Sequence, residues 1–102
     1  MTPEEINIAI AEIRGFVPVN YPSGTKIWRF PEGYKTAHSK PYVWEHELPD
    51  YYRCPVACLD MEGFLLTQKG IYFSRYQKEV INIKDPLDIP ARCRAFLRAF
   101  SV

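Results

Sequence analysis

Residues 2–15 read Thr-Pro-Glu-Glu-Ile-Asn-Ile-Ala-Ile-Ala-Glu-Ile-Arg-Gly, and the prediction of the fold starts from this stretch. Thr2 and Glu5 have the spacing of a capping box, and the proline between them suits the first turn of a helix. Four apolar residues follow at helical spacing, and Gly15 is a suitable C-cap. These four are Ile6, Ala9, Ile10 and Ile13. The stretch therefore predicts a helix over residues 3–14.

The next part of the chain predicts a small antiparallel sheet. Residues 16–24 contain two prolines and a Ser-Gly pair, which is typical of turns. Residues 26–30 (Lys-Ile-Trp-Arg-Phe) mix polar and apolar side chains in the alternating manner of a half-buried strand, which ends at Pro31. Residues 42–44 predict a second short strand. The two strands would pair across the loop between them.

The middle of the chain predicts a helix over residues 55–65, with Pro55 in an early position. Val56, Leu59 and Gly63 would share its apolar face, and Thr67 can cap the element that follows. Residues 71–83 fit helical and strand spacing alike, so periodicity leaves their structure open.

The last predicted element is a helix capped by Asp88. Its apolar stripe consists of Cys93, Phe96, Leu97 and Phe100, and the arginines of this region lie off the stripe, where solvation is the usual role. No linker or repeat divides the chain, so residues 1–102 are expected to form a single domain. The fold class is α+β, with a small antiparallel sheet covered by N-terminal, middle and C-terminal helices.

Composition excludes several classes of protein. A hydrophobic fraction of 47% and a charged fraction of 25% are ordinary for a globular domain, and the net charge of +1 gives no basis for binding a membrane surface. No apolar run approaches the roughly 18 residues of a transmembrane helix, and the N-terminus lacks the pattern of a signal peptide. Three cysteines are an odd number for a disulfide framework, which favours reduced thiols in a cytoplasm.

Three short segments give the chain a family resemblance. They are residues 1–7 (Met-Thr-Pro-Glu-Glu-Ile-Asn), Pro49-Asp50-Tyr51, and residues 91–98 (Ala-Arg-Cys-Arg-Ala-Phe-Leu-Arg). They resemble segments of a family of small bacteriophage proteins, the phage ABA-sandwich domain. The resemblance implies helices covering an antiparallel sheet and a phage genome as the source, and it implies no activity. The family usually continues after the second segment with Asp-Leu-Asn-Ala, whereas residues 54–57 read Cys-Pro-Val-Ala here.

Residue types that suit zinc are present, but their spacing does not converge. Cys54 and Cys58 with Cys93 and His46 supply four ligands. A single Cys-x3-Cys is a weaker signal than a Cys-x2-Cys knuckle, and free cysteines commonly pack as small buried hydrophobes. We therefore expect core thiols and no metal or other cofactor.

Catalytic machinery is not evident either. A cysteine nucleophile would need a base such as His38 or His46, and nothing in the sequence brings these residues together. Asp60 and Glu62 lie two residues apart and would point to different sides of a helix, which is a poor geometry for shared chemistry. No phosphate-binding glycine loop, HExxH or GxSxG motif occurs. The expectation is that the protein is not an enzyme.

Residues 26–44 are the best candidate for a binding site, because they interleave aromatic and basic side chains. Such side chains can contact a protein partner or stack on bases and pair with phosphates. Strand alternation favours a core role for Trp28 and Phe30. The predicted binding residues are Arg29, Tyr34, Lys35, Lys40, Tyr42 and Trp44.

The leading functional hypothesis is a phage accessory protein in the host cytoplasm that binds a host macromolecule, with a protein as the expected partner. An inhibitor of a bacterial defence system is the class that fits this description. The alternative is a module that sequesters a signalling nucleotide, for which a homo-oligomer with a pocket at its interface would suit so short a chain. A small hydrolase or nuclease is the second alternative.

Overall fold

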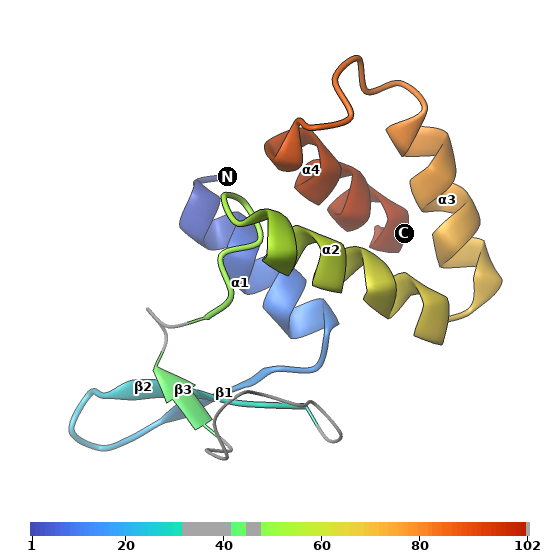
Figure 1. Cartoon of the computed structure of the whole chain (residues 1–102). Helices are drawn as coiled ribbons and strands as arrows, with labels where there is room; N and C mark the ends of the chain where they lie inside the picture. The colour runs from blue at the N-terminus through green and yellow to red at the C-terminus, as the bar shows by residue number, and fades with distance from the viewer. Residues whose placement is uncertain (32–41, 45–47, 102) are drawn as a thin grey trace.

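The computed structural model describes residues 1–31, 42–44 and 48–101, with the backbone alone described for residues 42–44. The chain is α+β: its helices gather on one side, and an antiparallel sheet lies beyond the end of the first helix (Figure 1). The elements are α1 (Pro3–Ile13), β1 (Val17–Asn20), β2 (Lys26–Arg29), β3 (Tyr42–Trp44), α2 (Pro55–Phe64), the 3-10 helix η2 (Leu65–Thr67), α3 (Gly70–Val80) and α4 (Ile89–Phe100). Within the described residues, no helix has the length and apolar character needed to cross a bilayer.

The start of α1 confirms the predicted capping box. The Thr2 hydroxyl accepts a hydrogen bond from the Glu5 backbone amide at 3.1 Å, and the Thr2 amide donates to the Glu5 carboxylate at 3.1 Å. The helix ends at Ile13, and Gly15 follows with φ +99°. A Cβ at Gly15 would also lie 3.0 Å from Pro31. Glycine is therefore required there both for its backbone conformation and for its size.

The two predicted strands, β2 and β3, are confirmed, and they pair with each other. The prediction of turns throughout residues 16–24 was wrong, because Val17–Asn20 form a third strand, β1. β1 pairs with β2 in antiparallel register, and the turn itself is confined to residues 21–25. Pro18 is tolerated because β1 lies at the edge of the sheet that the described strands form, and its backbone pairs there with β2 alone.

Each face of β2 buries one apolar side chain. Trp28 is buried in the main hydrophobic core, as predicted, and Phe30 packs partly buried against that core with its ring edge-to-face on Phe16, 5.5 Å between centroids. Ile27 is buried as well, although it lies on the opposite face of the strand and apart from the main core. Arg29, on the same face as Ile27, is exposed.

α2 occupies the predicted residues but turns a different face inward. Its buried residues are Cys58 and Met61, followed by Leu65 in η2. The predicted inward face was wrong, because Val56 and Leu59 are exposed to solvent. The prediction that Thr67 caps the next element was also wrong: its hydroxyl donates to the Phe64 carbonyl, and Lys69 occupies the N-cap of α3 without a side-chain cap.

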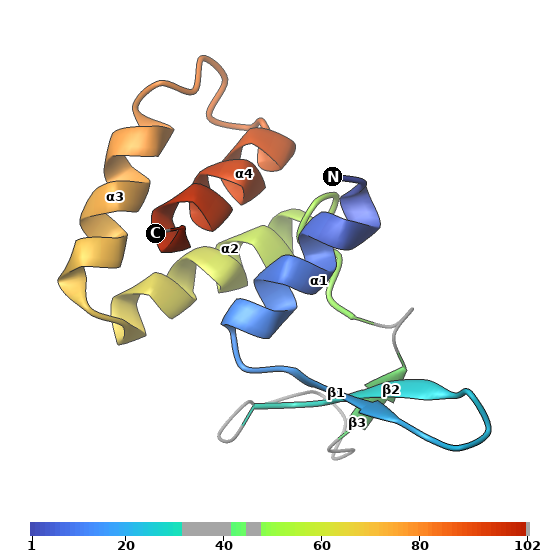
Figure 2. The same ribbon diagram turned by 180° about the vertical axis from the view of Figure 1, so that it is seen from behind.

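The remaining helices complete the core. The segment that periodicity left open is helical over Gly70–Val80. The Asp88 carboxylate accepts a hydrogen bond from the Ala91 amide at 3.1 Å, which confirms the predicted cap of α4. The predicted stripe of α4 is buried or partly buried, and α4 packs against α1, α2 and α3 (Figure 2). This central helix therefore holds the helical part together.

Candidate functional site

Three of the six predicted binding residues come together on one face of the sheet. The register places Tyr42 directly opposite Arg29, and Trp44 directly opposite Ile27. Positions that face each other in an antiparallel ladder share a face and lie about 4.5–5.5 Å apart at Cβ. The other three predicted residues, Tyr34, Lys35 and Lys40, lie outside the described residues.

We define the outer sheet face as the two cross-strand rows on the side opposite Trp28. The rows are Val17, Arg29 and Tyr42, and Val19, Ile27 and Trp44. Val17 and Arg29 are exposed, and no carboxylate pairs with Arg29 within the part of the chain that the structure describes. An exposed guanidinium beside an aromatic and an apolar position is the composition that binding surfaces favour. The same composition serves contacts with bases and phosphates.

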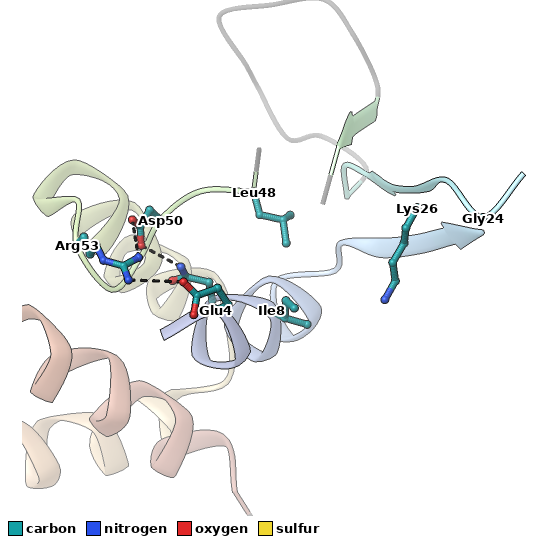
Figure 3. A pocket seen from close by; sticks show the side chains of 8 residues that line it. Glu4, Ile8, Gly24, Lys26, Leu48, Asp50 and Arg53 are labelled. Carbon is teal, nitrogen blue, oxygen red and sulfur yellow. Dashed lines mark hydrogen bonds and ion pairs between the residues drawn. The ribbon is translucent and has the colours of Figure 1, made fainter. Parts of the chain in front are cut away.

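A second candidate is a cleft of about 620 Å³ between α1, β2 and the segment before α2 (Figure 3). Its lining residues are Glu4, Asn7, Ile8, Gly24, Lys26, Leu48, Asp50 and Arg53. Arg53 reaches between two carboxylates, with a nitrogen 3.3 Å from Asp50 and another 3.6 Å from Glu4. The hydrogen bond to Asp50 is the main cause that raises the pKa of Arg53.

The polar groups of this cleft mainly join the chain segments that form it. The Asn7 side-chain amide donates to Asp50 at 2.9 Å, and its carbonyl accepts from the Tyr52 backbone amide at 3.0 Å. Asn7 thereby ties α1 to the segment that precedes α2. A partly buried side chain that satisfies two partners at once is typical of a structural joint.

The three segments from which the sequence predicts a family resemblance meet at this joint. Asn7 of the opening segment contacts Asp50 of the middle one. In the last segment, the Cys93 thiol donates to the Tyr51 carbonyl at 3.0 Å, and Arg94 donates to the Tyr52 hydroxyl at 3.2 Å. Short motifs far apart in the sequence therefore form one packing unit, which sequence spacing alone did not reveal.

Two ion pairs of α2 lie on different sides of the helix, as predicted for Asp60 and Glu62. Asp60 accepts from Arg14 of α1 at 2.7 Å, and Glu62 accepts from Arg92 of α4 at 2.6 and 2.7 Å. The expectation that Arg92 is merely solvated was wrong, because its side chain is mostly buried in this pair.

Tyr76 of α3 completes the second ion pair by donating its hydroxyl hydrogen bond to Glu62. Burial first, and then the hydrogen bond to the Glu62 carboxylate, raise the pKa of Tyr76 far above its ordinary value. Three helices are thus joined through one carboxylate. These contacts identify the Glu62 carboxylate as a structural link between α2, α3 and α4.

The cysteines do not form the predicted zinc candidate within the described residues. Cys58 and Cys93 are buried beside each other, whereas Cys54 is exposed, so the expectation that all three are core thiols was wrong for Cys54. The neighbouring Cys58 sulfur, and then burial, raise the pKa of Cys93, which keeps its thiol protonated. In the described part of the chain no three His, Cys, Asp or Glu side chains gather around a common point, and His38 and His46 lie outside it.

Comparison of the chain with protein-family models, with curated proteins and with solved structures finds no match.

Proposed function

We propose that this chain is a non-catalytic binding protein whose outer sheet face docks on a host macromolecule. The observation that carries the proposal is the strand register, which puts Tyr42 beside the exposed Arg29 on the face opposite the buried Trp28. Trp28 anchors the sheet to the helical core. On the opposite face Ile27 is buried, whereas Val17 and Arg29 are exposed and available to a partner. A sheet fixed in this way loses little conformational entropy when it binds.

The proposed biological setting follows from the family resemblance. Its three segments pack on one another around Asn7, Asp50 and Cys93, which supports the idea that they form a unit. We accordingly propose a phage accessory protein that acts in the host cytoplasm, with inhibition of a bacterial defence system as its role.

The contacts of the remaining polar groups support binding rather than catalysis. Glu62, Asp60 and Asp50 each accept hydrogen bonds from a neighbouring arginine or asparagine that links two segments of the chain. Carboxylates held in this way serve as supports for the fold. The outer sheet face, in contrast, offers Arg29 without such a partner among the described residues.

The test uses the immobilised full chain and a bacterial lysate, with quantitative mass spectrometry of the retained proteins. We expect one stoichiometric partner, whose retention falls about tenfold or more with Arg29→Glu, since reversing an interface charge commonly has this effect. Lys84→Glu, an exposed basic residue outside the sheet, is the matched control and leaves retention unchanged. No stoichiometric partner, or equal retention by both variants, contradicts the proposal.

A nucleotide is the second candidate ligand, because an arginine beside an aromatic position can pair with a phosphate while a base stacks on the ring. Calorimetry with a panel of cyclic nucleotides tests it directly. Heat that is lost with Arg29→Glu and kept with Lys84→Glu would replace the macromolecular partner with a nucleotide. A panel without heat would retire this candidate.

A further inference from the structure

A small pocket lies between the beginning of the chain and α4. Its volume is about 250 Å³, which is less than most pockets for drug-sized ligands have. Met1 and Ile6 line one side, and Arg94, Leu97 and Arg98 of α4 line the other. Ile6 is buried and Leu97 is partly buried, so they form an apolar floor, whereas both arginines are exposed beside it. We name these five residues the α1–α4 pocket.

The charges of the α1–α4 pocket have one sign. Arg94 and Arg98 are four residues apart on α4, which puts them on the same side of the helix. Among the described residues that line the pocket there is no carboxylate. The cleft beside β2 differs, because its Arg53 lies between two carboxylates of the same cleft. The α1–α4 pocket is therefore the better place for an anion.

The charge of Arg94 is not balanced by any carboxylate in the described part of the chain. Its guanidinium donates one hydrogen bond, to the neutral Tyr52 hydroxyl at 3.2 Å, and lies 5.8 Å from the centre of the same ring. These contacts hold the side chain without neutralising it. A guanidinium has five N–H donors, so most of those of Arg94 are available to a ligand.

The charge of Arg98 is shared with a carboxylate. Its Nε donates to Glu79 of α3 at 2.7 Å, and its two terminal nitrogens make no hydrogen bond within the described residues. Glu79 therefore balances one of the two positive charges beside the pocket. One positive charge, that of Arg94, is left without a counterion.

We propose that the α1–α4 pocket binds a small aliphatic monocarboxylate. The carboxylate lies on Arg94 and the terminal nitrogens of Arg98, and the aliphatic chain lies on Ile6 and Leu97. Guanidinium groups pair with carboxylates through parallel N–H···O bonds, and each buried methylene of the chain adds to the affinity. One unbalanced positive charge matches a ligand with one negative charge better than a phosphate monoester, which carries nearly two.

The α1–α4 pocket has no residue in common with the outer sheet face, so this proposal does not depend on the proposed function. A protein C-terminus with an apolar last residue has the same chemistry as a free aliphatic carboxylate. The proposal assigns the pocket to the free molecule, and the experiment distinguishes the two sources.

The probe is octanoate below its micelle-forming concentration, titrated into the isotope-labelled full chain and followed by NMR. We expect saturable shifts of the Ile6 and Leu97 methyl signals. Octanamide keeps the chain without the charge, and acetate keeps the charge without the chain. Each should bind about tenfold more weakly than octanoate or less. Raised salt should weaken octanoate and leave octanamide unchanged.

Variants of the arginines locate the carboxylate. Arg94→Gln should weaken octanoate about tenfold, whereas Lys84→Gln, at an exposed basic residue outside the pocket, should leave it unchanged. Glu79→Gln should strengthen octanoate about threefold, because it frees Arg98 from a competing carboxylate. Circular dichroism melts establish that the variants are folded, and the comparison of octanoate with octanamide on the wild type does not need them.

Equal affinities for octanoate and octanamide overturn the proposal, as do the absence of saturable shifts and an unchanged affinity in Arg94→Gln. A weaker affinity in Glu79→Gln contradicts the role of Arg98. A tetrapeptide with a free C-terminal leucine, compared with its C-terminal amide, tests the other source. Binding of the free peptide without binding of octanoate would overturn the assignment to a small molecule.

Discussion

The helices α2 and α4 both carry apolar residues at helical spacing, and they use them differently. The predicted stripe of α4 is buried or partly buried, whereas Val56 and Leu59 of the predicted α2 stripe are exposed and other residues of α2 are buried instead. The cause lies in the contrast between faces. The exposed Arg94 and Arg98 mark the polar side of α4, and Arg92 lies at its margin in the pair with Glu62. In contrast, α2 has apolar residues on two faces, so that its periodicity permits two orientations. The spacing of apolar residues predicts that a segment is helical. Its buried side can be predicted only when one face is apolar and the others are polar.

The largest expected effect is a difference in unfolding free energy between a truncation in the predicted stripe of α4 and one in the predicted stripe of α2. Phe96→Ala in α4 removes a fully buried ring and should lower the free energy of unfolding by about 3–5 kcal/mol. Leu59→Ala in α2 removes an exposed side chain and should change it by about 0.5 kcal/mol or less. Urea titrations followed by circular dichroism measure both. A loss of about 2 kcal/mol or more for Leu59→Ala would show that the stripe is covered within the monomer.

The second effect distinguishes the arginines of α4 from one another. Glu62→Gln removes the charge that pairs with the mostly buried Arg92 and should cost about 2 kcal/mol, because a charge is left with a weaker partner. Glu79→Gln removes the equally short but exposed pair with Arg98 and should cost about 0.5 kcal/mol or less. The same denaturation experiment applies. Equal costs would mean that burial does not separate the two pairs.

The third effect is a dependence on alkaline pH that comes from Tyr76. Its pKa is raised in the folded protein, so below the ordinary tyrosine value of about 10 both states keep the proton. Above that value the unfolded chain loses the proton first, and stability should fall by up to about 1.4 kcal/mol per pH unit. Urea midpoints at pH 8, 10 and 11 should fall less steeply for Tyr76→Phe than for the wild type. Parallel slopes would argue against the buried hydrogen bond to Glu62.

The smallest effect is a gain in stability on the exposed side of α2. Gly63→Ala should raise the free energy of unfolding by about 0.5–1 kcal/mol, because alanine favours the helix and its Cβ meets no other atom. Gly15→Ala should lower it, since φ is +99° there and Pro31 lies against the new Cβ. Melting temperatures of the two variants should therefore move in opposite directions. A destabilised Gly63→Ala would mean that the stripe is packed.

Local signals in the sequence predicted much of the fold. The capping box at Thr2, the cap at Asp88 and the strand predicted over residues 26–30 involve neighbours a few residues apart. The structure confirms all three, with the strand ending one residue earlier, at Arg29. β1 was missed because its proline and the turn after it dominate the local pattern. Only the pairing with β2 shows that Pro18 lies on an edge strand, where the missing N–H of proline is tolerated.

The candidate sites were less accessible to sequence reasoning because they depend on register and long-range packing. That Arg29, Tyr42 and Trp44 belong to one face follows from a register that sequence spacing does not fix. Glu62 and Arg92 lie 30 residues apart in the sequence, and the residues around each of them give no local pattern from which their ion pair could be predicted. The phage source and the host partner stay predictions from the family resemblance.

The position of α4 at the centre of the helical part has a consequence for synthesis of the protein on the ribosome. α4 packs against α1, α2 and α3, and it follows all three of them in the sequence. Until it emerges, the nascent chain has no central helix on which the others can assemble, and their apolar surfaces stay available to chaperones or to aggregation. The chain is therefore expected to fold after translation of α4, in one late and cooperative step.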